Sequence, residues 1–156
     1  MRIAIPNYCI IMSKFINISE AASLAIHSMA LIAVGNAKLN VNKIAEITGA
    51  SRNHLAKVLQ TLVKYDLLVS NRGPKGGFEL KRAADQVSLF EVYQLMEGTI
   101  DRDHCGLHTS PCPFSDCIFG GMTRQFTSDF IEYLQNKKLS DIQYKTHLYE
   151  KNDHKH

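Results

Sequence analysis

Two short apolar-periodic segments joined by a tight turn constrain this chain more than any other feature. In residues 41–48 the apolar side chains recur at helical spacing, and Gly49 suits the left-handed residue that ends a helix. Ser51 is a favourable N-cap for the segment that follows. The apolar residues of that segment recur at i, i+3, i+4 and i+7, and they are Leu55, Val58, Leu59 and Leu62. The pattern predicts a helix-turn-helix.

The flanking segments predict a wing and three further helices. Residues 67–69 and 78–80 are short apolar runs separated by the glycine-rich turn 72–77, which predicts a β-hairpin. Apolar periodicity predicts the other helices over residues 19–34, between Ser88 and Gly98, and over 122–136. The last of these has an apolar stripe that we expect to pack on a partner subunit, with the first helix of its own chain as the alternative. The stripe consists of Met122, Phe126, Phe130, Tyr133 and Leu134.

The expected fold is therefore mainly α with a small β-hairpin. Its divisions are an N-terminal extension outside the periodic pattern (1–12), a winged helix-turn-helix domain (13–84), a connecting helix (85–100), a cysteine loop (101–121), a dimerisation helix (122–143) and a disordered tail (144–156). Because the periodic pattern begins after Met12, that residue is an alternative start to Met1.

Positive charge gathers on one part of the chain. The net charge is only +3, but residues 51–82 carry seven basic and two acidic side chains and so sum to +5. A local basic patch on a nearly neutral protein is typical of a nucleic-acid-binding face. A solvated helix face next to a turn would produce the same distribution.

The second helix of a helix-turn-helix enters the major groove by its N-terminal end, so polar residues there are the candidates for DNA contact. Arginine suits the two acceptors of guanine, and asparagine suits the edge of adenine. The candidates are Ser51, Arg52, Asn53, His54, Lys57, Gln60 and, on the hairpin turn, Arg72 and Lys75. The glycines of that turn would allow close approach to the DNA backbone. Ordinary surface exposure is the competing interpretation for each side chain.

Three cysteines lie in one short loop, at positions Cys105, Cys112 and Cys117. The chain has no secretory signal pattern and no apolar run near the ~18 residues of a membrane span, so we expect a cytoplasmic protein with reduced thiols and no membrane partner. Clustered cysteines in that setting indicate a metal or iron–sulfur site rather than structural disulfides. Their gaps match neither zinc ribbons nor ferredoxins.

An enzyme is the rival interpretation of the same loop. Cys105 with His104 or His108 could form a nucleophile and its base. No third orienting group, phosphate-binding loop or pair of carboxylates accompanies them. We therefore expect neither an enzyme nor a small-molecule substrate.

Several segments together resemble the iron–sulfur winged-helix transcriptional regulator family. They are residues 49–62, the turn 72–77, the helix start 88–92 and the three-cysteine loop, and the resemblance spans about residues 13–143. Ser-Arg-Asn-His at the start of the recognition helix most resembles the nitric-oxide-sensitive branch. The resemblance implies a homodimer joined through the C-terminal helix and bound to a roughly palindromic double-stranded operator. It also implies a repressor whose operator affinity is controlled by an iron–sulfur cluster that senses nitric oxide, redox state or iron supply.

The resemblance further implies how the cluster is held. The three cysteines supply thiolates, and we expect a [2Fe–2S] cluster in preference to [4Fe–4S]. For the remaining ligand, Glu20 of the partner subunit ranks before His108 and His104, because the histidine used elsewhere in the family falls at Gly120 here. Glu20 could equally be a first-turn acid favoured by the helix dipole. The alternatives are a regulator that uses the same thiols as a zinc site or thiol/disulfide switch, and a cluster-free regulator that senses a small molecule.

Overall fold

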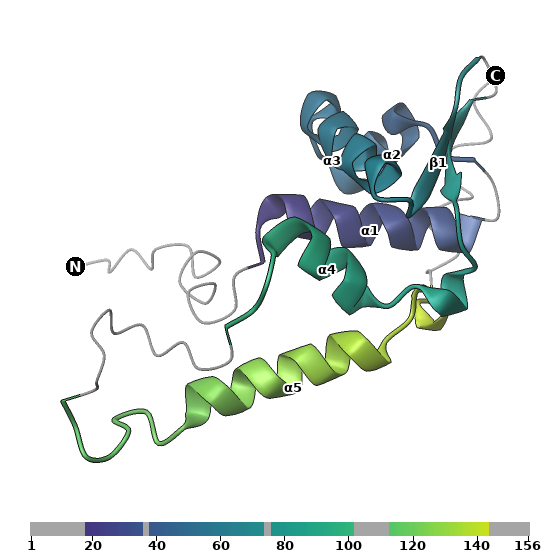
Figure 1. The fold of residues 1–156 in the computed structure, drawn as a ribbon. Coiled ribbons are helices and arrows are strands. Elements are labelled where there is room, and N and C mark those ends of the chain that lie inside the picture. Colours follow the sequence, from purple (N-terminus) through teal and green to yellow (C-terminus); the bar gives the residue numbers. More distant parts are fainter. Residues whose placement is uncertain (1–17, 36–37, 74–75, 102–112, 144–156) are drawn as a thin grey trace, which may run out of the picture.

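The computed structural model describes residues 18–35, 38–73, 76–101 and 113–143 (Figure 1). Its elements are α1 (Glu20–Gly35), α2 (Val41–Thr48), α3 (Arg52–Lys64), β1 (Leu68–Asn71), β2 (Gly77–Leu80), the 3₁₀ turn η2 (Ala84–Gln86), α4 (Leu89–Glu97), α5 (Met122–Asn136) and the 3₁₀ turn η3 (Leu139–Asp141). The expected mainly α fold with one hairpin is confirmed. The extension 1–12, residues 102–112 of the cysteine loop and the tail from residue 144 lie outside the described residues.

Helix α1 forms the centre of the fold. In Figure 1, α2, α3 and the hairpin lie on one side of it, and α4 and α5 lie on the other. Its apolar side chains therefore spread around the helix instead of forming one stripe, because both sides are covered. Ala22, Ala25 and Met29 are completely buried. Ser19 caps the helix, since the Ala22 N–H donates to Ser19 Oγ at 3.1 Å.

The helix-turn-helix follows the predicted local chemistry. Gly49 ends α2 with a φ of 71°, in the left-handed region that glycine adopts without strain. Ser51 caps α3 by accepting a hydrogen bond from the His54 N–H at 3.2 Å. The four apolar residues at i, i+3, i+4 and i+7 are all buried. Their burial turns the polar side of α3 away from the core.

The hairpin begins one residue later than the apolar pattern predicts. The Leu67 N–H still bonds to Leu62 O at 3.0 Å, so Leu67 completes the end of α3 and strand β1 starts at Leu68. Strands β1 and β2 are antiparallel, in a register that pairs Leu68 with Leu80 and Asn71 with Gly77.

Residue Leu39 adds a bridge to this hairpin that the sequence pattern does not predict. Its N–H donates to Phe78 O at 3.2 Å, and its carbonyl accepts from the Phe78 N–H at 2.8 Å. Both side chains are buried in the core. The wing is thereby attached to the segment that leads into α2.

Helix α5 packs on α4 through one of its faces. Ile131 and Leu134 are buried, and the ring of Phe130 meets Tyr93 edge-on at 5.3 Å. Burial, and then the charge of Glu97, raises the pKa of Tyr93. No helix in the described part of the chain has the length and apolarity needed to cross a membrane.

The segment 122–143, expected as one dimerisation element, divides at the end of α5. After Asn136 the chain turns back toward α4, where the Leu89 N–H donates to Lys137 O at 2.9 Å and the Leu139 N–H donates to Val87 O at 3.0 Å. Leu139 is buried at this return. The return ties the far end of α5 to the start of α4.

Candidate nucleic-acid interface and thiol site

The structure gathers most of the predicted DNA-contacting residues on the outer face of α3. The exposed members of this face are Ser51, Arg52, Asn53, Lys57 and Gln60, and His54 is partly exposed. They share one face because the apolar residues of the helix occupy the opposite one. The result is a polar, positively charged helix face with the N-terminus of the helix at one end.

Arg52 is held by a residue that the sequence pattern does not identify. Its Nη1 donates to Asn42 Oδ1 at 3.3 Å, which links the start of α3 to the first turn of α2. Such a bond limits the positions of the guanidinium before any ligand arrives. Only the crossing of the two helices brings Asn42 to this place, so no local signal could have found it.

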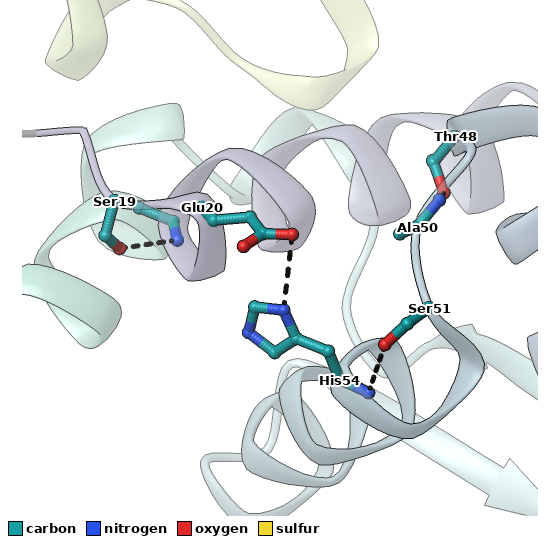
Figure 2. A network of polar contacts seen from close by, with 7 residues as sticks. Ser19, Glu20, Thr48, Ala50, Ser51 and His54 are labelled. Carbon is teal, nitrogen blue, oxygen red and sulfur yellow. Dashed lines mark hydrogen bonds and ion pairs between the residues drawn. The ribbon is translucent and has the colours of Figure 1, made fainter. Parts of the chain in front are cut away.

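His54 lies against the carboxylate expected to serve as a cluster ligand. Its Nδ1 is 3.4 Å from Glu20 Oε1, and the two side chains are 36% and 72% exposed (Figure 2). Glu20 stands in the first turn of α1, where the helix dipole also favours a negative charge. This polar contact therefore connects α1, the central helix, with α3, the candidate recognition helix.

The wing contributes Arg72, which is exposed, whereas Lys75 lies outside the described residues. Two of the wing glycines have a role within the fold that the sequence pattern does not predict. A Cβ at Gly77 would lie 2.8 Å from Leu39 O, and a Cβ at Gly76 would overlap the backbone of Asn71. These glycines are required by contacts within the chain, whatever the turn does at DNA.

Among the described basic residues between positions 51 and 82, two have carboxylate partners in the fold. Lys81 Nζ lies 2.6 Å from Asp66 Oδ1, and Arg82 pairs with Glu91. These pairs lower the effective charge at the base of the wing. The positive surface in the described part of this window therefore centres on α3 and the hairpin turn.

Cys117 is the one member of the three-cysteine loop within the described residues, and it is exposed. Cys105, Cys112, His104 and His108 lie outside them. The backbone N–H groups of Gly121, Phe119 and Gly120 hold the pKa of the Cys117 thiol below its ordinary value, with a further contribution from Arg124. A thiolate is the form that binds metals and iron–sulfur clusters, so the chemistry of this residue fits such a group.

The described residues alone do not assemble a metal site. No group of three or more histidine, cysteine or acidic side chains in the ranges given above could hold a metal ion. The Glu20 carboxylate contacts His54, on the recognition helix of its own subunit. The predicted ligand set therefore depends on residues 102–112 and on a second subunit.

Apolar side chains remain uncovered along α5 and just before it. They are Phe114, Ile118, Phe119, Met122, Phe126 and Tyr133, each more than 40% exposed. Several large apolar side chains exposed within one short part of the chain favour an interaction surface. We call these six residues the outer α5 face.

A family profile described as an iron-dependent transcriptional regulator, Rrf2, matches residues 18–145. The chain belongs to the Rrf2 family. It is therefore a winged-helix transcriptional regulator that binds DNA, and not an enzyme. The family resemblance seen in the sequence is confirmed.

Individual Rrf2 relatives support the same assignment. The chain is 26% identical over 126 residues to the transcriptional regulator IscR of Sodalis glossinidius, covering 80% of this chain and 72% of that protein. It is 27% identical over 105 residues to the regulator NsrR of Halalkalibacterium halodurans, covering 66% and 72%. The fold is similar to that of CymR, the global cysteine regulator of B. subtilis, with a TM-score of 0.65 at 20% identity, covering 80% and 93%.

Proposed function

We propose that this Rrf2 regulator is a dimeric repressor whose operator affinity is controlled by an iron–sulfur cluster that senses nitric oxide, redox state or iron supply. The observation that carries the proposal is the presence, in one chain, of an exposed polar recognition helix and an exposed Cys117, shortly before α5, whose thiol pKa is lowered by neighbouring backbone N–H groups. Similarity to regulators named IscR and NsrR supports it.

The reading of DNA is assigned to α3 and the wing. Arg52 and Asn53 at the exposed start of α3 would meet base edges, while Lys57 and Gln60 extend the same face. Arg72 and, outside the described residues, Lys75 would reach phosphates or the minor groove. Replacing both wing residues by alanine should weaken binding to all sequences and flatten its salt dependence. An unchanged affinity for DNA in this double variant would show that the wing does not contribute to DNA binding.

The cluster is assigned to the cysteine loop. Cys105, Cys112 and Cys117 would supply three thiolates. The partner subunit's Glu20 is the first candidate for the remaining ligand, before His108 and His104. When bound, an iron–sulfur cluster supplies a centre that reacts with nitric oxide and oxidants. A coupling of only ~1–3 kcal/mol between its state and DNA binding would suffice for control.

Dimerisation is assigned to the outer α5 face. Helix α5 already buries Ile131 and Leu134 within its own subunit, whereas Met122, Phe126 and Tyr133 are exposed and so remain available for a second subunit. Covering such side chains stabilises an interface by about 25 cal/mol per Å² of apolar surface. A homodimer would also present two recognition helices to a palindromic operator.

Anaerobic purification and DNA-binding measurements test this function. The purified protein should be coloured and contain iron and sulfide, and its affinity for an operator selected from random DNA should change at least about fivefold when the cluster is removed. Nitric oxide should produce the same change. Replacing Cys112 by alanine should abolish cluster binding while leaving a folded dimer. A colourless protein that contains zinc, or equal affinity with and without iron, would refute cluster control and favour a zinc or thiol switch.

A further inference from the structure

Asn42 and Arg52 connect the two helices of the helix-turn-helix at the points where those helices begin. The Arg52 guanidinium donates from Nη1 to Asn42 Oδ1 at 3.3 Å, and both residues are exposed. Arg52 is a candidate for contact with a base edge, whereas Asn42 has been given no role in DNA binding. The hydrogen bond therefore joins a candidate base-reading side chain to a residue whose purpose is open.

The backbone on both sides of this hydrogen bond is held by helix caps. Asn40 caps α2 and Ser51 caps α3, through side-chain oxygens that accept backbone N–H groups at 2.9 Å and 3.2 Å. Asn42 and Arg52 each lie in the first turn that follows its cap. Because the caps hold both first turns, the bond between Asn42 and Arg52 acts on the arginine side chain itself.

An arginine side chain has to be ordered before it can read a base. Its stem has several rotatable bonds, and fixing such a side chain during binding lowers the affinity. A guanidinium carries five N–H donors, so one bond to Asn42 leaves donors for the two acceptors of guanine. A partner that holds the group in the free protein therefore reduces the ordering cost and restricts which base edge the guanidinium meets.

The acceptor at Asn42 is neutral, unlike the partners of two other basic residues. Lys81 and Arg82 pair with carboxylates at the base of the wing, and those pairs offset their positive charge. No carboxylate in the described part of the chain forms an ion pair with Arg52. An amide oxygen can orient the guanidinium and leave its full charge available to DNA.

We propose that Asn42 is a positioning residue for sequence recognition, which holds the Arg52 guanidinium in the orientation that reads a guanine without neutralising it. This inference rests on the proposed assignment of base reading to α3. Removing the amide then costs selectivity at one base pair. General attraction to DNA is kept, because the positive charge of Arg52 remains.

Binding to a set of related duplexes tests this role. The wild type selects a duplex from random DNA, and Kd is measured for that duplex, for each single-base-pair change in it and for an unrelated duplex. All proteins are full-length and prepared in the same way. Arg52→Ala should lose about fivefold or more of the preference for guanine at one position, which identifies the base pair that Arg52 reads. Asn42→Ala should lose about two- to tenfold of the preference at that same position.

Two further variants separate positioning from other effects of residue 42. In the Arg52→Ala background, Asn42→Ala should cause no additional loss, whereas its effect should simply multiply with that of the matched control Lys57→Ala. Asn42→Asp should keep the base preference but weaken binding to every duplex, because a carboxylate offsets the charge of Arg52. Asn42→Ala should leave the affinity for the unrelated duplex, its salt dependence and the urea midpoint of the protein unchanged.

The possible failures of this inference are distinguishable. Loss of a base preference in Arg52→Ala with no change in Asn42→Ala would overturn the positioning role alone. An Asn42→Ala effect that persists in the Arg52→Ala background would overturn it in favour of a direct contact between Asn42 and DNA. A uniform loss of affinity with a lowered urea midpoint would overturn it in favour of a structural role. If Arg52→Ala changes no base preference, the assignment of base reading fails and the positioning role fails with it. A wild-type affinity that does not depend on iron would refute cluster control and leave this inference standing.

Discussion

Replacing Gly77 by alanine should detach the wing from the helix-turn-helix. A Cβ at this position would lie 2.8 Å from the carbonyl oxygen and 2.9 Å from the carbonyl carbon of Leu39, and both atoms belong to backbone that cannot rotate away. The chain relieves the overlap only by separating Leu39 from β2. That movement breaks the pair of hydrogen bonds between Leu39 and Phe78.

The loss of stability in this variant can be estimated from the interactions that the bridge between Leu39 and Phe78 makes. Two backbone hydrogen bonds contribute about 0.5–1.5 kcal/mol each. Leu39 is only 8% exposed, and partial withdrawal of such a side chain from the core costs about 1 kcal/mol more. We therefore expect Gly77→Ala to lower the free energy of unfolding by about 3 kcal/mol. This is a large part of the stability of a domain of this size.

Urea unfolding followed by circular dichroism measures the loss, at one protein concentration for all variants. Gly49→Ala is the matched control, because Gly49 has a φ of 71° but open space around its Cβ position. It should cost about 1 kcal/mol, from backbone strain alone. In Gly77→Ala, hydrogen exchange at the amides of Leu39 and Phe78 should also accelerate.

Two results would refute this reasoning. One is a stability loss for Gly77→Ala no larger than that for Gly49→Ala. The other is weakened DNA binding with unchanged stability, which would mean that the glycine serves approach to DNA and not packing against Leu39.

Three further predictions concern other parts of the chain. Phe126→Glu should shift the protein from dimer to monomer in sedimentation, because it places a charge on the outer α5 face, whereas Phe126→Leu should remain dimeric; a dimeric glutamate variant would contradict this interface. In a variant whose other cysteines are serine, the lowered pKa of Cys117 means that its thiolate persists at lower pH than an ordinary thiol. Its alkylation rate should therefore reach half-maximum at lower pH in the folded protein than in urea, and equal midpoints would exclude the backbone effect. Ser28→Ala should raise the free energy of unfolding by about 1 kcal/mol in urea titration, because the buried Ser28 hydroxyl has no hydrogen-bond partner among the described residues. A destabilised variant would reveal such a partner.

Local patterns in the sequence were sufficient for the helices and their ends. Ser51 and Ser88 cap helices through backbone groups three residues away, and Gly49 ends a helix through its own conformation. Such interactions lie within one or two turns of chain, so they can be recognised before any folding is considered. The polar face of α3 was predictable for the same reason.

Contacts between segments that are distant along the chain could not be predicted from the sequence, and they change the interpretation of the site. The wing glycines were interpreted only in terms of approach to DNA, and no sequence pattern indicated that Gly77 also faces the backbone of Leu39, which is 38 residues away along the chain. Asn42 carried no signal at all, although it holds Arg52. Periodicity shows which face of an element is buried but not which other element covers it.

From its sequence alone, this protein is recognisable as a winged-helix regulator with a clustered-thiol loop, because capping, periodicity and residue type are properties of short stretches of chain. Only the tertiary structure shows that the Glu20 carboxylate contacts His54 and that backbone hydrogen bonds from Leu39 attach the wing. Those contacts depend on how α1 packs against α3 and on how the segment before α2 lies along β2. The relative position of elements is determined by the packing of many side chains at once, which no single stretch of sequence specifies.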